Sequence, residues 1–151
     1  MTKGNIQICI ILTILLGIFA AFSFSVNSQE SKVRVIAHPS VLIDELSTSQ
    51  IRRIFSMRQS VWPNQQAVVV FVLNEQNISH QIFSKKVLAM FPYQLERIWN
   101  KLVFSGLGER PIEVKDEQEM LAKIKNQPGA VGYVVFSPVN NGVKSIEIKK
   151  E

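Results

Sequence analysis

Short apolar runs alternate with amphipathic stretches along most of the 151-residue chain. Residues 32–38 alternate polar and apolar at first, as in a half-buried strand. Residues 67–73 and 131–136 are largely apolar, which is typical of strands covered on both faces. Shorter extended pieces are predicted at 112–114 and 143–148. These runs predict the strands of one sheet.

Helical signals fill the segments between these strands. Ser47-Thr48-Ser49-Gln50 forms a capping box and predicts a short helix that continues to about residue 57. Apolar residues at i, i+3, i+4 and i+7 predict an amphipathic helix that begins near Pro92 and buries Trp99. Further helices are predicted at about 79–90 and 116–126. Strands that alternate with helices indicate a single α/β sandwich with a mixed sheet.

Two turns frame the last part of the chain. In Gln127-Pro128-Gly129-Ala130-Val131-Gly132-Tyr133, Pro128 stops the preceding helix and Gly129 supplies a positive φ for the reversal. Gly132, inside the strand, indicates close approach of another element or a ligand to the backbone. Asn140-Asn141-Gly142 predicts a second turn, so the chain is expected to end in a hairpin.

The N-terminal segment has a different character. Residues 6–24 are almost continuously apolar, Lys3 precedes them, and Val26-Asn27-Ser28 offers an exit site for cleavage. We therefore expect residues 1–28 to be a secretory signal peptide and residues 29–151 to be the exported domain. The apolar run is longer than an ordinary signal-peptide core, so an uncleaved membrane anchor is the alternative.

Composition and charge exclude several classes of function. The single cysteine, Cys9, lies in the N-terminal segment, so the exported part has no disulfide framework, zinc–thiolate site or cysteine nucleophile. Without Lys3 that part has 16 basic and 12 acidic residues, a net charge of +4. This modest excess suits small anions or an anionic envelope surface. The basic residues are scattered and no nucleic-acid-binding motif occurs, so nucleic acid is not an expected partner.

Several segments resemble, in the same order, the phosphate-binding proteins of ABC transporters. Residues 35–39 resemble that family's strand ending in Asn-Pro, and residues 46–55 its Leu-Thr/Ser-x-x-Gln-Leu…Ile-Phe helix. Trp62 resembles the Trp before the next strand, and residues 128–133 the Pro-Gly-Ala-(Val/Ile)-Gly-Tyr turn. The helix after the binding loop is matched by Phe83, Val87 and Leu88. The resemblance implies a type 2 periplasmic-binding-protein fold, in which two α/β lobes close on an oxyanion, and this chain is long enough for about one lobe.

The resemblance also points to a binding loop, in which this chain departs from the family. The family has Ser-Gly-Thr at a helix start, with an arginine four residues before the serine; here Asn77, Ile78 and Ser79 follow Leu73. The glycine lets the backbone approach an anion and the arginine adds a bidentate charge, so their replacement predicts weak phosphate binding. Free amides at the helix start make Asn77, Ile78 and Ser79 the candidate oxyanion site. Ordinary capping of the helix by Asn77 and Ser79 is the alternative interpretation.

No catalytic or metal-binding pattern is found in the sequence. His38 and His80 are the only histidines, and neither has the spacing of a catalytic triad or a metal site. We interpret His38 as a structural hydrogen-bonding residue and His80 as facing solvent in the first turn of a helix. Ser105, Gly106 and Gly108 form either a plain helix stop or a loop at the edge of a cleft. No enzyme activity, metal or cofactor is expected.

The leading hypothesis is an exported, non-enzymatic, single-lobe relative of phosphate-transporter substrate-binding proteins that binds phosphate or a related oxyanion weakly. It would be periplasmic, or membrane-anchored if the signal is uncleaved, with a membrane transporter or another envelope protein as partner. The alternative hypothesis is a periplasmic interaction or sensor-input module that kept the fold and lost the ligand.

Overall fold

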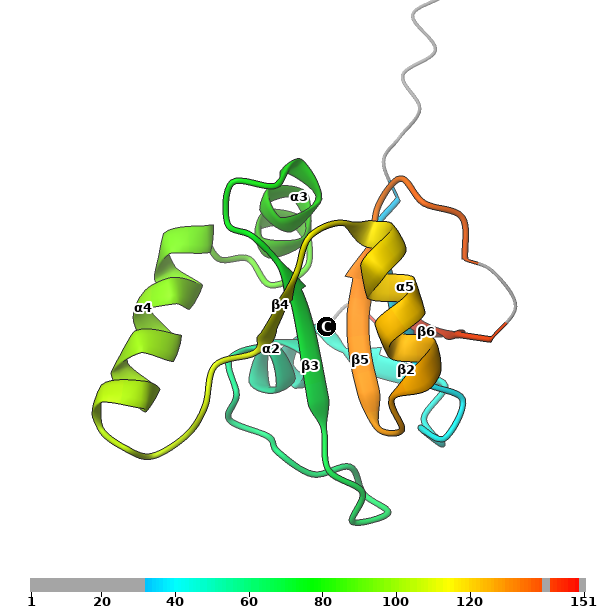
Figure 1. Cartoon of the computed structure of the whole chain (residues 1–151), viewed down its shortest axis with the longest axis horizontal. Coiled ribbons are helices and arrows are strands. Elements are labelled where there is room, and N and C mark those ends of the chain that lie inside the picture. Colours follow the sequence, from blue (N-terminus) through cyan, green and yellow to red (C-terminus); the bar gives the residue numbers. More distant parts are fainter. Residues whose placement is uncertain (1–31, 140–141, 150–151) are drawn as a thin grey trace, which may run out of the picture. The chain divides into compact units, whose positions relative to one another are not determined.

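The computed structural model describes residues 32–139 and 142–149, which form a mixed six-stranded sheet with four helices (Figure 1). The strands are β1 (Arg34–Ala37), β2 (Glu45–Ser47), β3 (Val69–Leu73), β4 (Ile112–Val114), β5 (Ala130–Val134) and β6 (Lys144–Lys149). The helices are α2 (Thr48–Phe55), α3 (Ile78–Lys86), α4 (Pro92–Phe104) and α5 (Glu117–Asn126). The predicted α/β fold with a mixed sheet is confirmed. The predicted signal or anchor segment lies outside the described residues.

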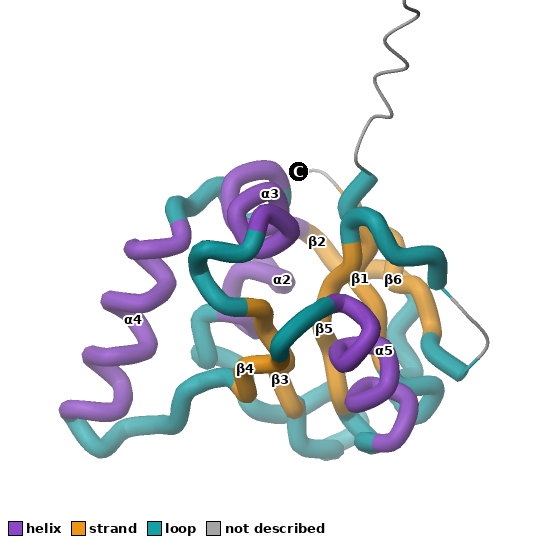
Figure 2. Tube along the Cα trace, turned by 45° about the horizontal axis from the view of Figure 1, so that its top comes forward, coloured by secondary structure: helices purple, strands orange, loops and turns teal. Residues whose placement is uncertain are grey.

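The sheet has the strand order β2-β6-β1-β5-β3-β4. The neighbouring strands β5 and β3 can be followed in Figure 2. β3 is parallel to both β4 and β5, whereas β1 is antiparallel to β5. The carboxyl ends of β3, β4 and β5 and the amino end of β1 therefore lie at one edge of the sheet, here called the carboxyl edge. Within the described ranges, no helix has both the length and the apolar character to cross a membrane.

The predicted terminal hairpin is wrong. β6 pairs with β1 and β2 rather than with β5, because β1 and β3 already occupy both edges of β5. A turn signal predicts that the chain reverses, but not which strand it reaches. β2 was not predicted; it has three residues and runs directly into the capping box of α2, which is the signal that the sequence shows there. Residues 140–141 of the predicted turn lie outside the described residues.

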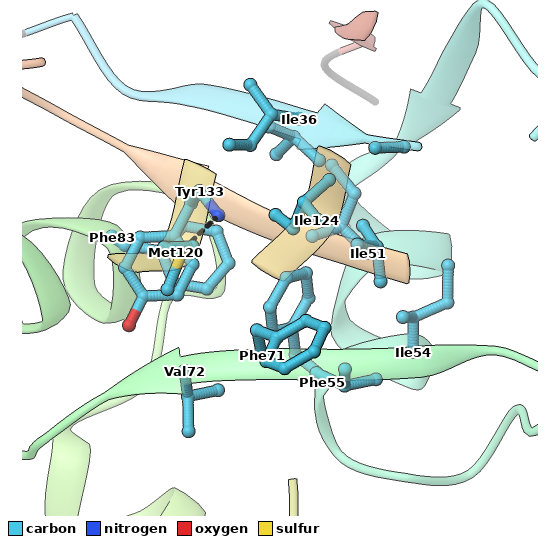
Figure 3. Close-up of a cluster of buried hydrophobic side chains, with 14 of the residues drawn as sticks. Ile36, Ile51, Ile54, Phe55, Phe71, Val72, Phe83, Met120, Ile124 and Tyr133 are labelled. Carbon is cyan, nitrogen blue, oxygen red and sulfur yellow. Dashed lines mark hydrogen bonds between the residues drawn. The ribbon is translucent and has the colours of Figure 1, made fainter. Parts of the chain in front are cut away.

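The core forms because successive side chains of β5 point to opposite faces of the sheet. On one face, α5 lies directly over Gly132, where a Cβ would be 2.7 Å from both Met120 Sδ and Ile124 Cδ1. On the other face, the Tyr133 ring stacks on Phe83 of α3 at 3.9 Å and lies 5.9 Å from Phe55 of α2 (Figure 3). The close approach predicted at Gly132 is therefore that of a helix.

The edge opposite the carboxyl edge is organised around Gly129. This residue has φ +77°, as predicted, and a Cβ here would collide with the carbonyl oxygen of Ala67. The Trp62 indole donates to the Gly129 carbonyl oxygen at 2.9 Å, and the Gly129 amide donates to Ser40 Oγ at 3.0 Å. His38 Nδ1 in turn lies 2.8 Å from Ser40 Oγ, in the structural role predicted for it. Residues that resemble the phosphate-binding family thus meet at this turn and hold it.

Helix α4 is attached to the core through its two buried residues, Leu95 and Trp99. The Trp99 side chain is 2% exposed, and its indole N–H donates to the carbonyl oxygen of Phe55 at 2.9 Å. The helix ends at its C-cap Ser105, after which Gly106 has φ +67°, as is common where a helix stops.

Replacing Trp99 by alanine should lower the free energy of unfolding by roughly 3–5 kcal/mol, because a large buried ring is lost and a cavity remains. Tyr93→Ala on the same helix is the control; Tyr93 is 56% exposed, and its loss should cost less than about 1 kcal/mol. Chemical denaturation followed by circular dichroism measures both. Equal effects of the two substitutions would contradict the core position of Trp99.

Candidate functional site

The three residues of the predicted oxyanion site lie at the start of α3, directly beyond the carboxyl end of β3. Asn77 is the N-cap, and its Oδ1 accepts a hydrogen bond from the Ser79 amide at 2.9 Å. The Ile78 side chain is 58% exposed, whereas Ser79 is 3% exposed. The helix start therefore faces solvent at Ile78, and the Ser79 side chain points into the protein.

The Ser79 hydroxyl is hydrogen-bonded to the carboxylate of Glu117, the first residue of α5. Glu117 also accepts the backbone amides that follow β5: Val135 at 2.7 Å, Phe136 at 3.2 Å and Ser137 at 2.6 Å. Although charged, Glu117 is only 9% exposed. The start of α3, the start of α5 and the end of β5 are therefore joined by one carboxylate, here called the Glu117 cluster.

Burial by itself would raise the pKa of Glu117, since it disfavours the charged form. Hydrogen bonds from the Ser79 hydroxyl, from the amides of Val135 and Ser137 and from the Ser137 hydroxyl outweigh burial and bring the pKa below its ordinary value. The carboxylate is therefore ionised at neutral pH. A negative charge already lies beside the predicted oxyanion site.

Sequence reasoning missed the role of Glu117. From the sequence it is an acidic residue in the first turn of a helix, where it complements the helix dipole. Its partners at 135–137 are about twenty residues away in the chain, and no local pattern indicates them.

Leu73, which the resemblance matches to the family's arginine, is 1% exposed. Its side chain belongs to the core, so it leaves no charge at the start of α3. A cation does occur elsewhere on the carboxyl edge: the guanidinium of Arg34, on β1, donates to the carbonyl oxygen of Ser137. Arg34 thus holds the segment whose amides bind Glu117.

His80 is 1% exposed, so the prediction that it faces solvent is wrong. The Tyr133 hydroxyl accepts a hydrogen bond from the Leu73 amide at 2.9 Å, and its oxygen lies 2.6 Å from His80 Nδ1, with which it shares a second hydrogen bond. On the other side of the ring, His80 Nε2 is 3.4 Å from Ser84 Oγ. This buried chain of hydrogen bonds explains why the imidazole faces inward.

Burial lowers the pKa of His80 to about 4, against the opposing effect of the negative charges of Glu96 and Glu113. The histidine is therefore neutral at pH 7. It ties the start of α3 to β5 and to the end of β3.

A hollow beside α5 does not have the properties of an anion site, and the described residues offer no metal site. A hollow of about 360 Å³ lies along the C-terminal half of α5, lined by Phe71, Ala122, Lys123, Asn126 and Gln127. Carbonyl groups at a helix C-terminus disfavour anions, and Lys123 is the single charged residue of this lining. Among the described residues, no group of three or more His, Cys, Asp or Glu side chains could hold a metal ion.

The depressed pKa of His80 predicts that stability depends on pH. In the unfolded chain this histidine has its ordinary pKa of about 6.5 and binds a proton below that pH. In the folded chain His80 stays neutral down to about pH 4. Stability is therefore complete above the unfolded-state pKa and is lost as pH falls toward the folded-state pKa. Between about pH 7 and pH 5 the free energy of unfolding should fall by roughly 2 kcal/mol.

Urea denaturation at the two pH values tests this prediction. His80→Asn keeps a hydrogen-bonding group near the Nδ1 position but does not titrate, so it should remove most of the pH dependence while lowering stability at both values. A pH dependence that His80→Asn leaves unchanged would contradict this account.

With the geometry in place, the chain can be compared with known proteins. No family model and no curated protein matches the sequence. Solved structures do match: a phosphate ABC transporter substrate-binding protein with bound phosphate from Clostridium perfringens has a TM-score of 0.61 at 15% identity. An ABC-type phosphate transport receptor from Vibrio cholerae has a TM-score of 0.61 at 13% identity, and PstS from Borrelia burgdorferi 0.57 at 13%.

These matches cover 77%, 77% and 78% of this chain but 44%, 45% and 47% of the solved chains, respectively. This chain therefore spans less than half the length of those proteins, in agreement with the expected single lobe. At such low identity the similarity concerns the fold. The described residues have the fold of phosphate ABC transporter substrate-binding proteins, over less than half of their length.

Proposed function

We propose that this chain is a substrate-binding-protein-like domain that binds phosphate or a related small oxyanion weakly at the start of α3. The observation that carries the proposal is the position of that helix start at the carboxyl edge, where open α/β sheets bind ligands. The first amides of a helix lack acceptors within the helix, and they and the helix dipole favour an anion. A solved protein of the same fold holds phosphate, which supports this choice of ligand.

Three features of the described residues make the binding weak. Leu73 is buried and uncharged, so no charge-assisted hydrogen bond worth roughly 1.5–3 kcal/mol comes from this position. Asn77 already accepts from the Ser79 amide. The Glu117 carboxylate, hydrogen-bonded to the Ser79 hydroxyl, repels a second anion. We therefore expect a Kd on the order of a millimolar, equivalent to about −4 kcal/mol.

The proposal includes an exported location and a transporter partner. The predicted signal peptide at residues 1–28 supports export to the periplasm, with a membrane-anchored form as the alternative. The solved proteins of the same fold are named as components of ABC transport, which supports a membrane transporter as partner. In this role the domain binds its ligand without chemical change.

Calorimetric titration of the purified protein with phosphate tests the proposal. Asn77→Asp preserves the N-cap and adds a negative charge at the proposed site, so it should weaken phosphate binding about five-fold, roughly 1 kcal/mol. Ser79→Asp is unsuitable because Ser79 is buried against Glu117, where a second carboxylate would destabilise the fold.

Asn64→Asp is the matched control. Asn64 lies in the turn before β3, at the opposite end of that strand, and its Oδ1 accepts from the Gln66 amide at 3.2 Å, a role that aspartate also fills. This variant should bind phosphate as the unsubstituted protein does. Equal weakening by both variants would place the ligand elsewhere. The absence of saturable binding of phosphate, sulfate and carboxylates would favour the interaction module instead.

A further inference from the structure

We infer that the amides of Val135, Phe136 and Ser137, with the Ser79 hydroxyl, form an anion-binding site whose ligand in this chain is its own Glu117 carboxylate. When that side chain is removed, the site accepts a small free carboxylate. The inference rests on the contacts of Glu117 and does not require the proposed phosphate binding.

The donors around Glu117 have the geometry of an anion-binding site. Three successive backbone amides converge on a single carboxylate, as in the concave anion sites formed by consecutive N–H groups. Oε1 accepts from Val135 at 2.7 Å and Oε2 from Ser137 at 2.6 Å, and Phe136 lies 3.3 and 3.2 Å from the two oxygens. With the hydroxyls of Ser79 and Ser137, these donors can fill the acceptor positions of an ionised carboxylate. A neutral side chain would leave several of these donors unsatisfied.

Contacts other than those of Glu117 hold the donor segment, residues 135–137, in place. Val135 and Ser137 are 5% and 9% exposed, and they directly follow the central strand β5. Arg34 donates to the Ser137 carbonyl oxygen, and Gln118 Nε2 donates to Ser137 Oγ at 3.1 Å. The amides therefore stay directed at the same point after the carboxylate is removed.

The Glu117 cluster lies at a place in the fold that favours an anion. It lies beyond the carboxyl ends of β3 and β5 and beside the starts of α3 and α5, where both helix dipoles favour negative charge. A buried charge is stable only where hydrogen bonds replace water, and Glu117 has such hydrogen bonds from two segments of the chain.

Replacing Glu117 by alanine provides the test, because the atoms removed correspond in size and charge to acetate. The variant should be less stable than the unsubstituted protein, and acetate should restore its stability in a saturable manner. At about ten times the Kd of acetate, the unfolding equilibrium constant should fall about ten-fold, as for a ligand that binds only the folded state. Denaturation is measured against acetate concentration, with sodium chloride keeping the ionic strength constant.

Glu119→Ala is the matched control. Glu119 lies in the same turn of α5 and carries the same charge, but its carboxylate accepts from the Lys115 amide at 2.9 Å. Acetate should leave the stability of this variant, and of the unsubstituted protein, unchanged relative to chloride. If Glu117→Ala is unfolded alone, acetate should fold it, which circular dichroism detects.

A response of Glu117→Ala to acetate no larger than that of Glu119→Ala would overturn the inference. So would failure of an unfolded Glu117→Ala to fold at any acetate concentration. Neither result bears on phosphate binding at the start of α3, which is measured with Glu117 in place. Conversely, a failed phosphate titration of the unsubstituted protein leaves the acetate experiment unaffected.

Discussion

The carboxylate of Glu117 supplies the negative charge and the hydrogen-bond acceptors that balance the partial positive charges at the carboxyl edge of the sheet. Two helix starts and three consecutive amides meet there, and all of them present partial positive charge. Such an arrangement leaves unsatisfied donors unless an anion occupies it, and the cost of a buried unpaired amide is roughly 1–3 kcal/mol. In this chain the anion is part of α5. The same contact therefore positions α5, the start of α3 and the segment after β5, while Arg34 holds that segment from β1.

Segments that resemble the phosphate-binding family lie at one edge of the sheet, and the departures from that family lie at the other. At the edge opposite the carboxyl edge, Ser40, Trp62 and Gly129 form one set of hydrogen bonds, and Gly132 admits α5 onto the sheet. Trp62 and residues 128–133, which resemble the phosphate-binding family, thus stabilise the turn at Gly129 and allow α5 to approach the sheet. Both effects concern the fold. The departures from the family, Leu73, Asn77 and Ile78, lie at the carboxyl edge, where a ligand would bind. The fold is thus shared, whereas the residues at the carboxyl edge differ. This difference is consistent with the proposed weak binding of an oxyanion and with Glu117 as the anion that the amides after β5 bind.

Features set by neighbouring residues could be predicted from the sequence. The capping box at Ser47 and Gln50 is present, as are the positive φ of Gly129 and the burial of Trp99, because a few adjacent residues or one helical period determine each of them. The order of the strands could not be predicted, since a turn signal in the sequence at 140–142 does not reveal that β1 separates β5 from β6. His80 was misplaced for a similar reason: its partner, Tyr133, is 53 residues away in the chain. The role of Glu117 could not be predicted either, because its partners at 135–137 are about twenty residues away in the chain.

The account depends most directly on the Glu117 carboxylate being bound as an anion by the amides that follow β5. An NMR titration that follows the side-chain carboxyl carbon of Glu117, together with the amide protons of Val135 and Ser137, measures this directly. The account predicts a pKa below the ordinary value of 4.5, with the two amide protons shifting at the same midpoint as the carboxyl carbon. A pKa at or above 4.5, or amide protons that do not respond when Glu117 is protonated, would contradict it.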